Sequence, residues 1–126
     1  MNGFIFLSMI FLHILDDFHL QGRLIDMKQI SWWKKQTEDT KYKNDYLAAL
    51  FIHSFSWSFV ISLPILYMIN FEMNTFFKLI FIANIITHAY IDDLKANKFK
   101  INLVEAQSVH ILQICVLFLL YYVGVI

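Results

Sequence analysis

The sequence predicts an all-α fold, a four-helix transmembrane bundle. Hydrophobic residues make up 59% of the chain, whereas soluble domains usually contain about 45–50% apolar residues. Four apolar stretches approach the length of a membrane-spanning helix, and only one proline and three glycines are present to form turns. Because this length suits one compact unit, we expect residues 1–126 to form a single transmembrane domain.

The apolar stretches set the bounds of the expected helices. A helix needs roughly 20 predominantly apolar residues to cross the hydrocarbon core. We expect spanning helices at about residues 3–20, 46–69, 75–91 and 103–125. No Lys or Arg precedes the first stretch and no small-residue cleavage site follows it, so we expect a spanning helix there and not a cleaved signal peptide.

The basic residues predict the orientation in the membrane. Nine of the ten Lys and Arg residues lie in the connections 21–45 and 92–102. Four crossings place these two connections on the same side, and the positive-inside rule makes that side cytoplasmic. We therefore expect an integral protein of the bacterial inner membrane with both termini outside. The net charge of zero gives no footprint for nucleic-acid binding.

The long connection contains an aromatic and basic segment. Trp32 and Trp33 precede Lys34 and Lys35, and Trp favours the membrane interface while Lys favours anionic headgroups. We expect an amphipathic loop that rests on the bilayer, and the alternative is an interfacial helix at about residues 27–36.

Ionisable residues inside the expected helices are the main functional signal, because such groups are expensive in a membrane and mark functional sites. In the first and third helices an aspartate follows a histidine by four residues, a spacing that puts both side chains on one helix face, about 5–6 Å apart at Cβ. The second and fourth helices each carry one further histidine. The candidate metal ligands are His13, Asp17, His53, His88, Asp92 and His110.

The depths of these residues predict that they converge. At about 1.5 Å per residue, the four histidines lie within roughly 6–12 Å of the cytoplasmic helix ends. Each residue turns the helix by about 100°, so we expect Asp16 and Asp93 to point elsewhere. We expect His19 at the mouth of the bundle. The chain divides into two helical hairpins. In each, the first helix carries a His-x3-Asp motif and the second helix, which runs back across the membrane, carries one His. This repeat predicts a pseudo-two-fold axis along the membrane normal.

The residue types indicate metal chemistry. Neutral imidazole and carboxylate are good ligands for a divalent metal, most simply zinc, with manganese or another divalent ion as the alternative. Such a metal produces hydroxide near neutral pH or polarises a carbonyl or phosphoryl oxygen. The candidate catalytic residues are His13, Asp17, His88 and Asp92, with support expected from Gln21, Lys95, Glu105 and Gln107. The alternatives are a metal-free proton or substrate site and a set of interhelical hydrogen bonds that fix packing.

This pattern resembles that of an uncharacterised family of small bacterial and phage integral membrane proteins. The family pattern combines His-x3-Asp-Phe-x-Leu-Gln, a His in the second helix, His-x3-Asp-x2-Lys and Asp-Gln-x2-His. The matching residues are His13, Asp17, Phe18, Leu20, Gln21, His53, His88, Asp92, Lys95, Gln107 and His110. Ala106 stands where the family pattern has Asp, and Glu105 precedes it. The family is distantly similar to membrane-bound metal-dependent hydrolases, which implies hydrolysis by analogy.

These observations predict a membrane-embedded metal-dependent hydrolase that acts near the cytoplasmic leaflet on a lipid, a phosphoester or another ester. One alternative is a small proton- or cation-coupled transporter or channel-like oligomer built from copies of the chain. Another is a phage-type interaction protein without catalysis, whose partner is a host membrane protein. Bound metal separates the first reading from the interaction protein.

Overall fold

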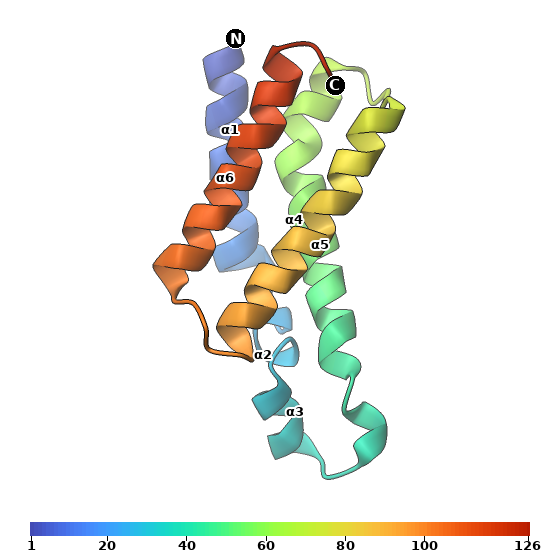
Figure 1. The fold of residues 1–126 in the computed structure, drawn as a ribbon, viewed down its shortest axis with the longest axis vertical. Helices are drawn as coiled ribbons and strands as arrows, with labels where there is room; N and C mark the ends of the chain where they lie inside the picture. The colour runs from blue at the N-terminus through green and yellow to red at the C-terminus, as the bar shows by residue number, and fades with distance from the viewer.

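Four long helices form the body of the molecule, and Figure 1 shows how they are arranged. The structure is a computed structural model that describes residues 1–126, and it contains no strand. The long helices are α1 (Asn2–Leu15), α4 (Asp45–Met68), α5 (Thr75–Ala96) and α6 (Leu103–Tyr122). Helices α1 and α5 each pack against both α4 and α6, so the order around the group is α1, α4, α5, α6. The predicted all-α fold is confirmed.

The helix ends differ from the prediction at two places. Helix α5 continues to Ala96, although its apolar stretch ends at Ile91, and α6 ends at Tyr122 and not near Val125. An apolar run shows which part of a helix can contact lipid or the core. The helical backbone hydrogen bonds can extend beyond that run into polar residues. The amide nitrogen of Asn97 still donates to the carbonyl of Asp93 at the end of α5.

Helix α1 changes its winding as it reaches the polar residues. The π-helical segment η1 (Asp16–Leu20) follows α1 directly. A π-turn contains more residues than an α-turn, so each residue rotates the helix by less. Two neighbouring side chains in η1 can therefore both lie on the inward side of the helix, and π-turns frequently occur at functional sites.

The long connection is partly helical, so the expectation of a loop was wrong for this segment. It contains α2 (Leu24–Met27), α3 (Ile30–Gln36) and the 3-10 turn η2 (Thr40–Tyr42). Aromatic contacts stabilise it: the Trp33 indole donates to the Met27 carbonyl at 2.7 Å and stacks on the Tyr42 ring at 6.2 Å.

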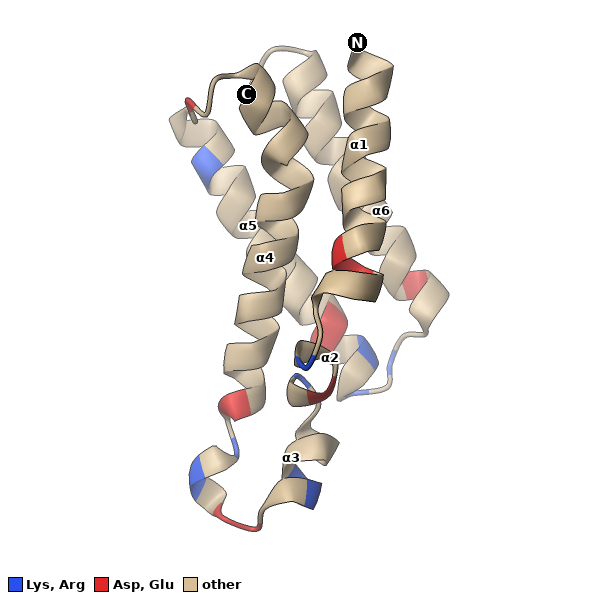
Figure 2. Cartoon of the chain, turned by 180° about the vertical axis from the view of Figure 1, so that it is seen from behind, with Lys and Arg blue, Asp and Glu red and all other residues tan.

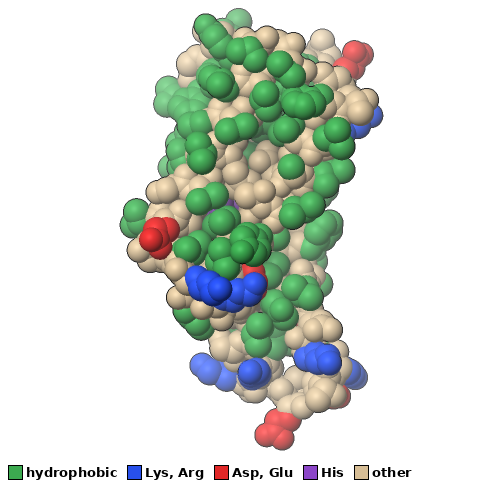
Figure 3. Space-filling model, in the orientation of Figure 1, with side chains coloured by type: hydrophobic (Ala, Val, Ile, Leu, Met, Phe, Trp, Pro, Cys, Tyr) green, Lys and Arg blue, Asp and Glu red, His purple; other side chains and the backbone are tan.

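The distribution of side chains is inverted relative to a soluble protein. Half of the 26 buried residues are polar or charged, and thirty large hydrophobic side chains are exposed. Figure 3 shows these hydrophobic side chains over much of the surface, with the histidines almost hidden. The segments Asn2–Leu20, Thr40–Met68 and Leu103–Tyr122 are long and apolar enough to span a membrane. These features are compatible with an integral membrane protein.

Charge separates the two ends of the molecule. Both termini and the turn between α4 and α5 lie at one end, and α2 and α3 lie at the other (Figure 1). Figure 2 shows the basic residues gathered at the end with α2 and α3, apart from Lys78 on α5. We call this the basic end.

An apolar core fills the half of the bundle nearer the termini. Nine buried hydrophobic residues from the four long helices form it: Ile5, Met9, Trp57, Ile61, Ile65, Leu66, Phe77, Ile114 and Leu117. On each helix the buried histidine lies beyond these residues, toward the basic end. The polar site is therefore closed on its terminal side by packed hydrocarbon.

Candidate metal centre

The structure brings all six predicted ligand residues into one buried level of the bundle. The long helices contribute one histidine each, and the histidines are at most 2% exposed. The aspartates come from η1 and α5, one turn beyond the histidine of the same helix. The group consists of His13, Asp17, His53, His88, Asp92 and His110, all buried.

Three ligand atoms form a compact triangle. Asp17 Oδ1 lies 3.3 Å from His53 Nε2 and 3.8 Å from His88 Nε2, and the two imidazole nitrogens are 3.1 Å apart. Ligand atoms bound 2.0–2.2 Å from a tetrahedral ion lie about 3.3–3.6 Å from one another. The observed separations bracket this range, so Asp17, His53 and His88 could hold one metal ion with small adjustments.

The aspartate oxygen in this triangle has no hydrogen-bond partner. Asp17 Oδ1 is buried and makes no hydrogen bond, although an unpaired buried carboxylate oxygen is costly. The nitrogens that it faces belong to His53 and His88, which are also buried. A cation among the three atoms would satisfy the oxygen and use the lone pairs of the imidazoles.

A second set of ligand atoms adjoins the first. His88, Asp92 and His110 also place three atoms close enough to hold an ion, and His110 Nε2 lies 3.4 Å from Asp92 Oδ1. His53 Nε2 is 3.4 Å from Asp92 Oδ2. The two sets therefore share His88 and merge into one buried group.

Each ring nitrogen of His110 faces a hydrogen-bond acceptor. The Gln113 amide donates to the carbonyl and side-chain oxygens of Asn84, at 3.2 and 3.1 Å, so the Gln113 oxygen faces His110 Nδ1 at 3.3 Å. His110 Nε2 faces Asp92 Oδ1 at 3.4 Å. A neutral imidazole has one hydrogen to donate, and with that hydrogen on Nδ1 the lone pair of Nε2 would be available to a metal.

His13 lies beside the two ligand sets and not within them. The Trp57 indole donates to His13 Nδ1 at 2.8 Å, so this nitrogen acts as an acceptor. His13 Nδ1 is 3.8 Å from Asp17 Oδ2. The Trp57 ring also stacks on the His88 ring, with centroids 4.2 Å apart. His13, expected as a ligand, is therefore in neither set of ligand atoms, and it packs with Trp57 beside them.

The expectation that Asp16 points away was wrong. Asp16 is 1% exposed, and its Oδ1 accepts a hydrogen bond from the Ser56 hydroxyl at 2.9 Å. Its Oδ2 lies 3.8 Å from His53 Nδ1, and neither of these atoms has a hydrogen-bond partner. The wider turn of η1 explains why Asp16 and Asp17 both face inward. Carboxylates placed behind a ligand histidine commonly orient its ring.

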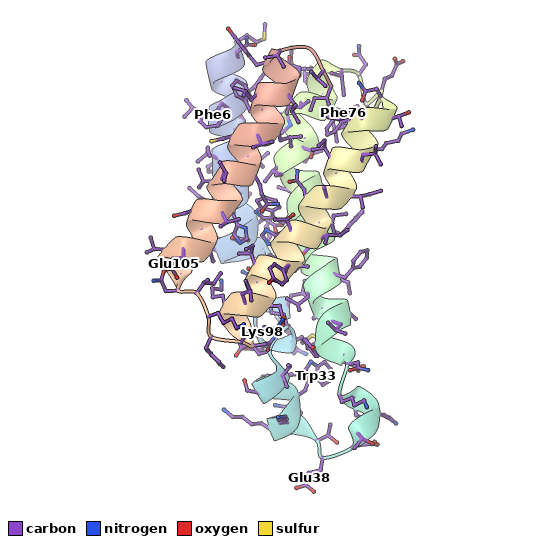
Figure 4. All side chains as sticks on the ribbon, viewed as in Figure 1. Phe6, Trp33, Glu38, Phe76, Lys98 and Glu105 are labelled. Atoms are coloured by element: carbon purple, nitrogen blue, oxygen red, sulfur yellow. The ribbon has the colours of Figure 1, made fainter.

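Asp93 points away from the centre, as the helical spacing predicts. It accepts a hydrogen bond from Asn97 Nδ2 at 2.8 Å and pairs with Lys98 at 3.2 Å. Figure 4 shows Lys98 near the basic end of α5. Asp93 and Lys98 therefore form a separate ion pair that serves as a natural comparison for the site. His19, expected at the mouth, is exposed.

Three of the four expected supporting residues contact the ligand aspartates. The Gln107 amide donates to Asp17 Oδ2 at 2.9 Å, and the Gln21 amide donates to the Asp17 carbonyl. Lys95 Nζ lies 3.9 Å from Asp92 Oδ1. The contacts of Gln107 and Gln21 hold Asp17 on one side, so that its Oδ1 remains directed at the imidazoles.

The expectation for Glu105 was wrong, because this residue belongs to a helix cap. Glu105 accepts from the Asn102 amide at 2.8 Å, and its own amide donates to the Asn102 side chain at 2.9 Å. This capping box satisfies free amides at the start of α6. Figure 4 shows Glu105 at the outer end of α6. The neighbouring Ala106 is buried, so no carboxylate enters the centre from this position.

One residue of the centre had no sequence signal. Lys28 follows α2 in the long connection, yet it is 5% exposed. Its Nζ donates to Asp92 Oδ2 at 2.6 Å and to Gln21 Oε1 at 3.0 Å. Asn97 holds this segment, since it donates to the Lys28 carbonyl and accepts from the Ile30 amide. The connection thus folds back under the bundle.

Comparisons of the chain with protein-family models, curated proteins and solved structures give no match. The chemistry of the centre is therefore argued from its own geometry.

Proposed function

We propose that this chain is a membrane-embedded metal-dependent hydrolase with its centre near the cytoplasmic leaflet. The observation that carries the proposal is the unpaired, buried Asp17 Oδ1 facing His53 Nε2 and His88 Nε2 at ligand-like separations. The resemblance to a family of small membrane proteins, and its distant similarity to metal-dependent hydrolases, agree with this reading.

The donor set favours zinc, with manganese or another divalent ion as the alternative, because it mixes imidazole nitrogens and carboxylate oxygens. Asp17, His53 and His88 would hold the ion, and Asp92 and His110, which form the adjoining set with His88, are candidate further ligands. A metal bound there would supply activated water or polarise a substrate oxygen. The substrate class is a lipid, a phosphoester or another ester.

Several chain residues would prepare this centre for reaction. Asp16 stands behind His53, with its Oδ2 3.8 Å from the ring Nδ1, where a carboxylate would orient the ring. Trp57 and His13 pack against His88 and Asp17 and keep them in place. The apolar core above the site excludes water from the terminal side, so substrate would arrive from the basic end.

The proposed bundle includes α5 as a fourth spanning helix. Its outward side carries exposed apolar residues at helical spacing: Phe76, Leu79, Ile82, Ile86 and Tyr90. Such a stripe on a helix with a polar inner face suits contact with lipid. The order α1, α4, α5, α6 places α1 opposite α5 and α4 opposite α6. This is the arrangement expected if the hairpins α1–α4 and α5–α6 are related by the proposed pseudo-two-fold axis.

The packed core also bears on the transporter alternative. A relay across the membrane needs polar groups or water over its full length. In this chain buried Ser58, Ser62, Asn84 and Gln113 follow the histidines toward the termini. Beyond them Ile65, Phe77 and Leu117 continue the apolar core, and no buried polar residue follows. The hydrolase needs access from one end only, so a packed terminal side favours it over a relay.

We expect both termini on the outer side of the inner membrane. The basic residues lie at the opposite end of the molecule (Figure 2), and basic connections are retained in the cytoplasm. Alkaline phosphatase fused after Ile126 should be active, and green fluorescent protein at the same place should be dark. A fluorescent C-terminal fusion would place the centre near the outer leaflet and refute the cytoplasmic substrate.

Metal content tests the proposed centre directly. We expect full-length protein, purified in detergent with zinc or manganese and without chelator, to retain about one metal ion per chain. Elemental analysis after gel filtration measures the ratio. Protein that retains no metal under these conditions would refute the hydrolase proposal.

A further inference from the structure

Two lysines meet at the ligand Asp92, one on each oxygen. Lys28 Nζ lies 2.6 Å from Oδ2, and Lys95 Nζ lies 3.9 Å from Oδ1. They come from different parts of the chain, since Lys28 follows α2 and Lys95 lies on α5. The Lys28 side chain is 6% exposed and that of Lys95 is 25% exposed, so the pair lies between the buried centre and the basic end.

The charges of the centre depend on whether a metal is bound. Three buried carboxylates, those of Asp16, Asp17 and Asp92, face two lysines, and the histidines are neutral in their ligating form. The formal charge is therefore one negative without a metal and one positive with a divalent ion. A positive group with little access to solvent favours an anionic ligand.

The lysines would then need a new partner. A carboxylate that ligates a metal gives part of its charge to the ion, so Asp92 would neutralise Lys28 and Lys95 less well. Lys28 reaches the ligand atoms themselves, because the Asp92 oxygen that it contacts is also 3.4 Å from His53 Nε2. An anion bound beside Asp92 would lie near both ammonium groups and near the residues that would hold the metal.

We infer that the metal-loaded centre binds a phosphoryl group, with Lys28 and Lys95 as its cationic contacts, an inference that rests on the proposed metal-dependent function. A phosphate monoester carries three acceptor oxygens and a charge near −2, enough to be shared among a metal and two lysines. Lysine is a common phosphate ligand that acts as a point charge. The substrate class narrows to phosphate esters, either a lipid headgroup or a soluble phosphate.

The test is a calorimetric titration of inorganic phosphate into the purified full-length chain. We expect about one phosphate to bind per zinc-loaded chain and none to bind chelator-treated protein, because metal and anion bind cooperatively. Lys28→Met should weaken phosphate binding at least about tenfold, since hydrogen bonds to charged groups are the stronger ones. Zinc content should not fall, as Lys28 is not a ligand. Lys28→Arg should retain most of the binding.

Lys98→Met is the matched control, because Lys98 also pairs with an aspartate at the basic end but contacts Asp93. It should bind phosphate like the wild type. If Lys28→Met does not fold, Lys95→Met serves in its place, since Lys95 is partly exposed on α5. If zinc-loaded wild type bound no phosphate, or if the lysine variants bound it with unchanged affinity, the phosphoryl inference would be overturned and the proposed metal-dependent function would not. A chain that takes up no zinc would remove the proposed function as well.

Two sources of the phosphoryl group can be separated in bilayers. The chain is reconstituted in phosphatidylcholine nanodiscs, with or without phosphatidic acid, and titrated with inorganic phosphate. Competition by phosphatidic acid assigns the site to a lipid phosphate. If inorganic phosphate binds equally in both kinds of nanodisc, the site is assigned to a soluble phosphate. If it binds in neither kind, the inference is overturned.

Discussion

Replacing His88 with alanine should remove the metal from the centre and abolish its function. His88 belongs to both sets of ligand atoms, so no alternative set survives its loss. Changing a residue that only orients a ligand commonly weakens metal binding about 10–100-fold, and loss of the ligand itself should exceed that. Elemental analysis of purified wild type and His88→Ala measures the effect, and Asp92→Asn should also lose metal.

Asp93→Asn is the matched control for these variants. Asp93 follows Asp92 directly, but it pairs with Lys98 and Asn97 outside the centre. It should retain the metal content of the wild type. A purely structural cluster predicts another result, because interhelical hydrogen bonds in membranes average about 0.6 kcal/mol. If His88→Ala lowered stability slightly and changed no metal content, the cluster would be a packing element.

The convergence of the ligands could be predicted because helical geometry determines it. A four-residue spacing puts His88 and Asp92 on one face, and a constant rise per residue relates position to depth. Both rules apply to a straight α-helix. These rules succeeded for α5, which is α-helical from Thr75 to Ala96. They failed for Asp16, since α1 becomes a π-helix there and no feature of the sequence announces that change.

The apparent symmetry of the two hairpins concealed a difference between their histidines. Trp57 follows His53 by four residues, and the corresponding position after His110 is Ile114. An indole can donate a hydrogen bond and an isoleucine cannot. The Trp57 indole donates to His13 Nδ1, whereas the corresponding Nδ1 of His88 has no hydrogen-bond partner. A short repeat in a sequence therefore predicts equivalent positions but not equivalent roles.

Lys28 shows where prediction from the sequence ends. The positive-inside rule counts this residue among the basic residues of a connection, and on average such lysines lie in water or at headgroups. Its burial depends on Asn97, at the end of α5, which holds the Lys28 carbonyl and the Ile30 amide. These contacts join residues almost 70 positions apart, and local patterns carry no information about such pairs.

Asp17→Asn should have opposite effects on stability with and without metal. In metal-free protein the substitution removes a buried, unpaired carboxylate oxygen. Unsatisfied buried groups cost about 1–3 kcal/mol, and the amide that replaces it can donate to His53 or His88. We therefore expect the variant in chelator to unfold at the wild-type temperature or above it.

With metal the order should reverse. At free zinc of about a hundred times its Kd, binding stabilises the wild type by about 2.7 kcal/mol. An amide is a much poorer ligand than a carboxylate, so Asp17→Asn should gain little from the same zinc. Thermal unfolding in detergent, with zinc and with chelator, measures both limits, and Asp93→Asn should follow the wild type in each. If the variant unfolded at a lower temperature than the wild type in chelator, and zinc did not raise the unfolding temperature of the wild type, Asp17 would be a residue that stabilises helix packing. If zinc reversed the order of the two unfolding temperatures, the unpaired oxygen would destabilise the metal-free fold and would be present because it binds a cation.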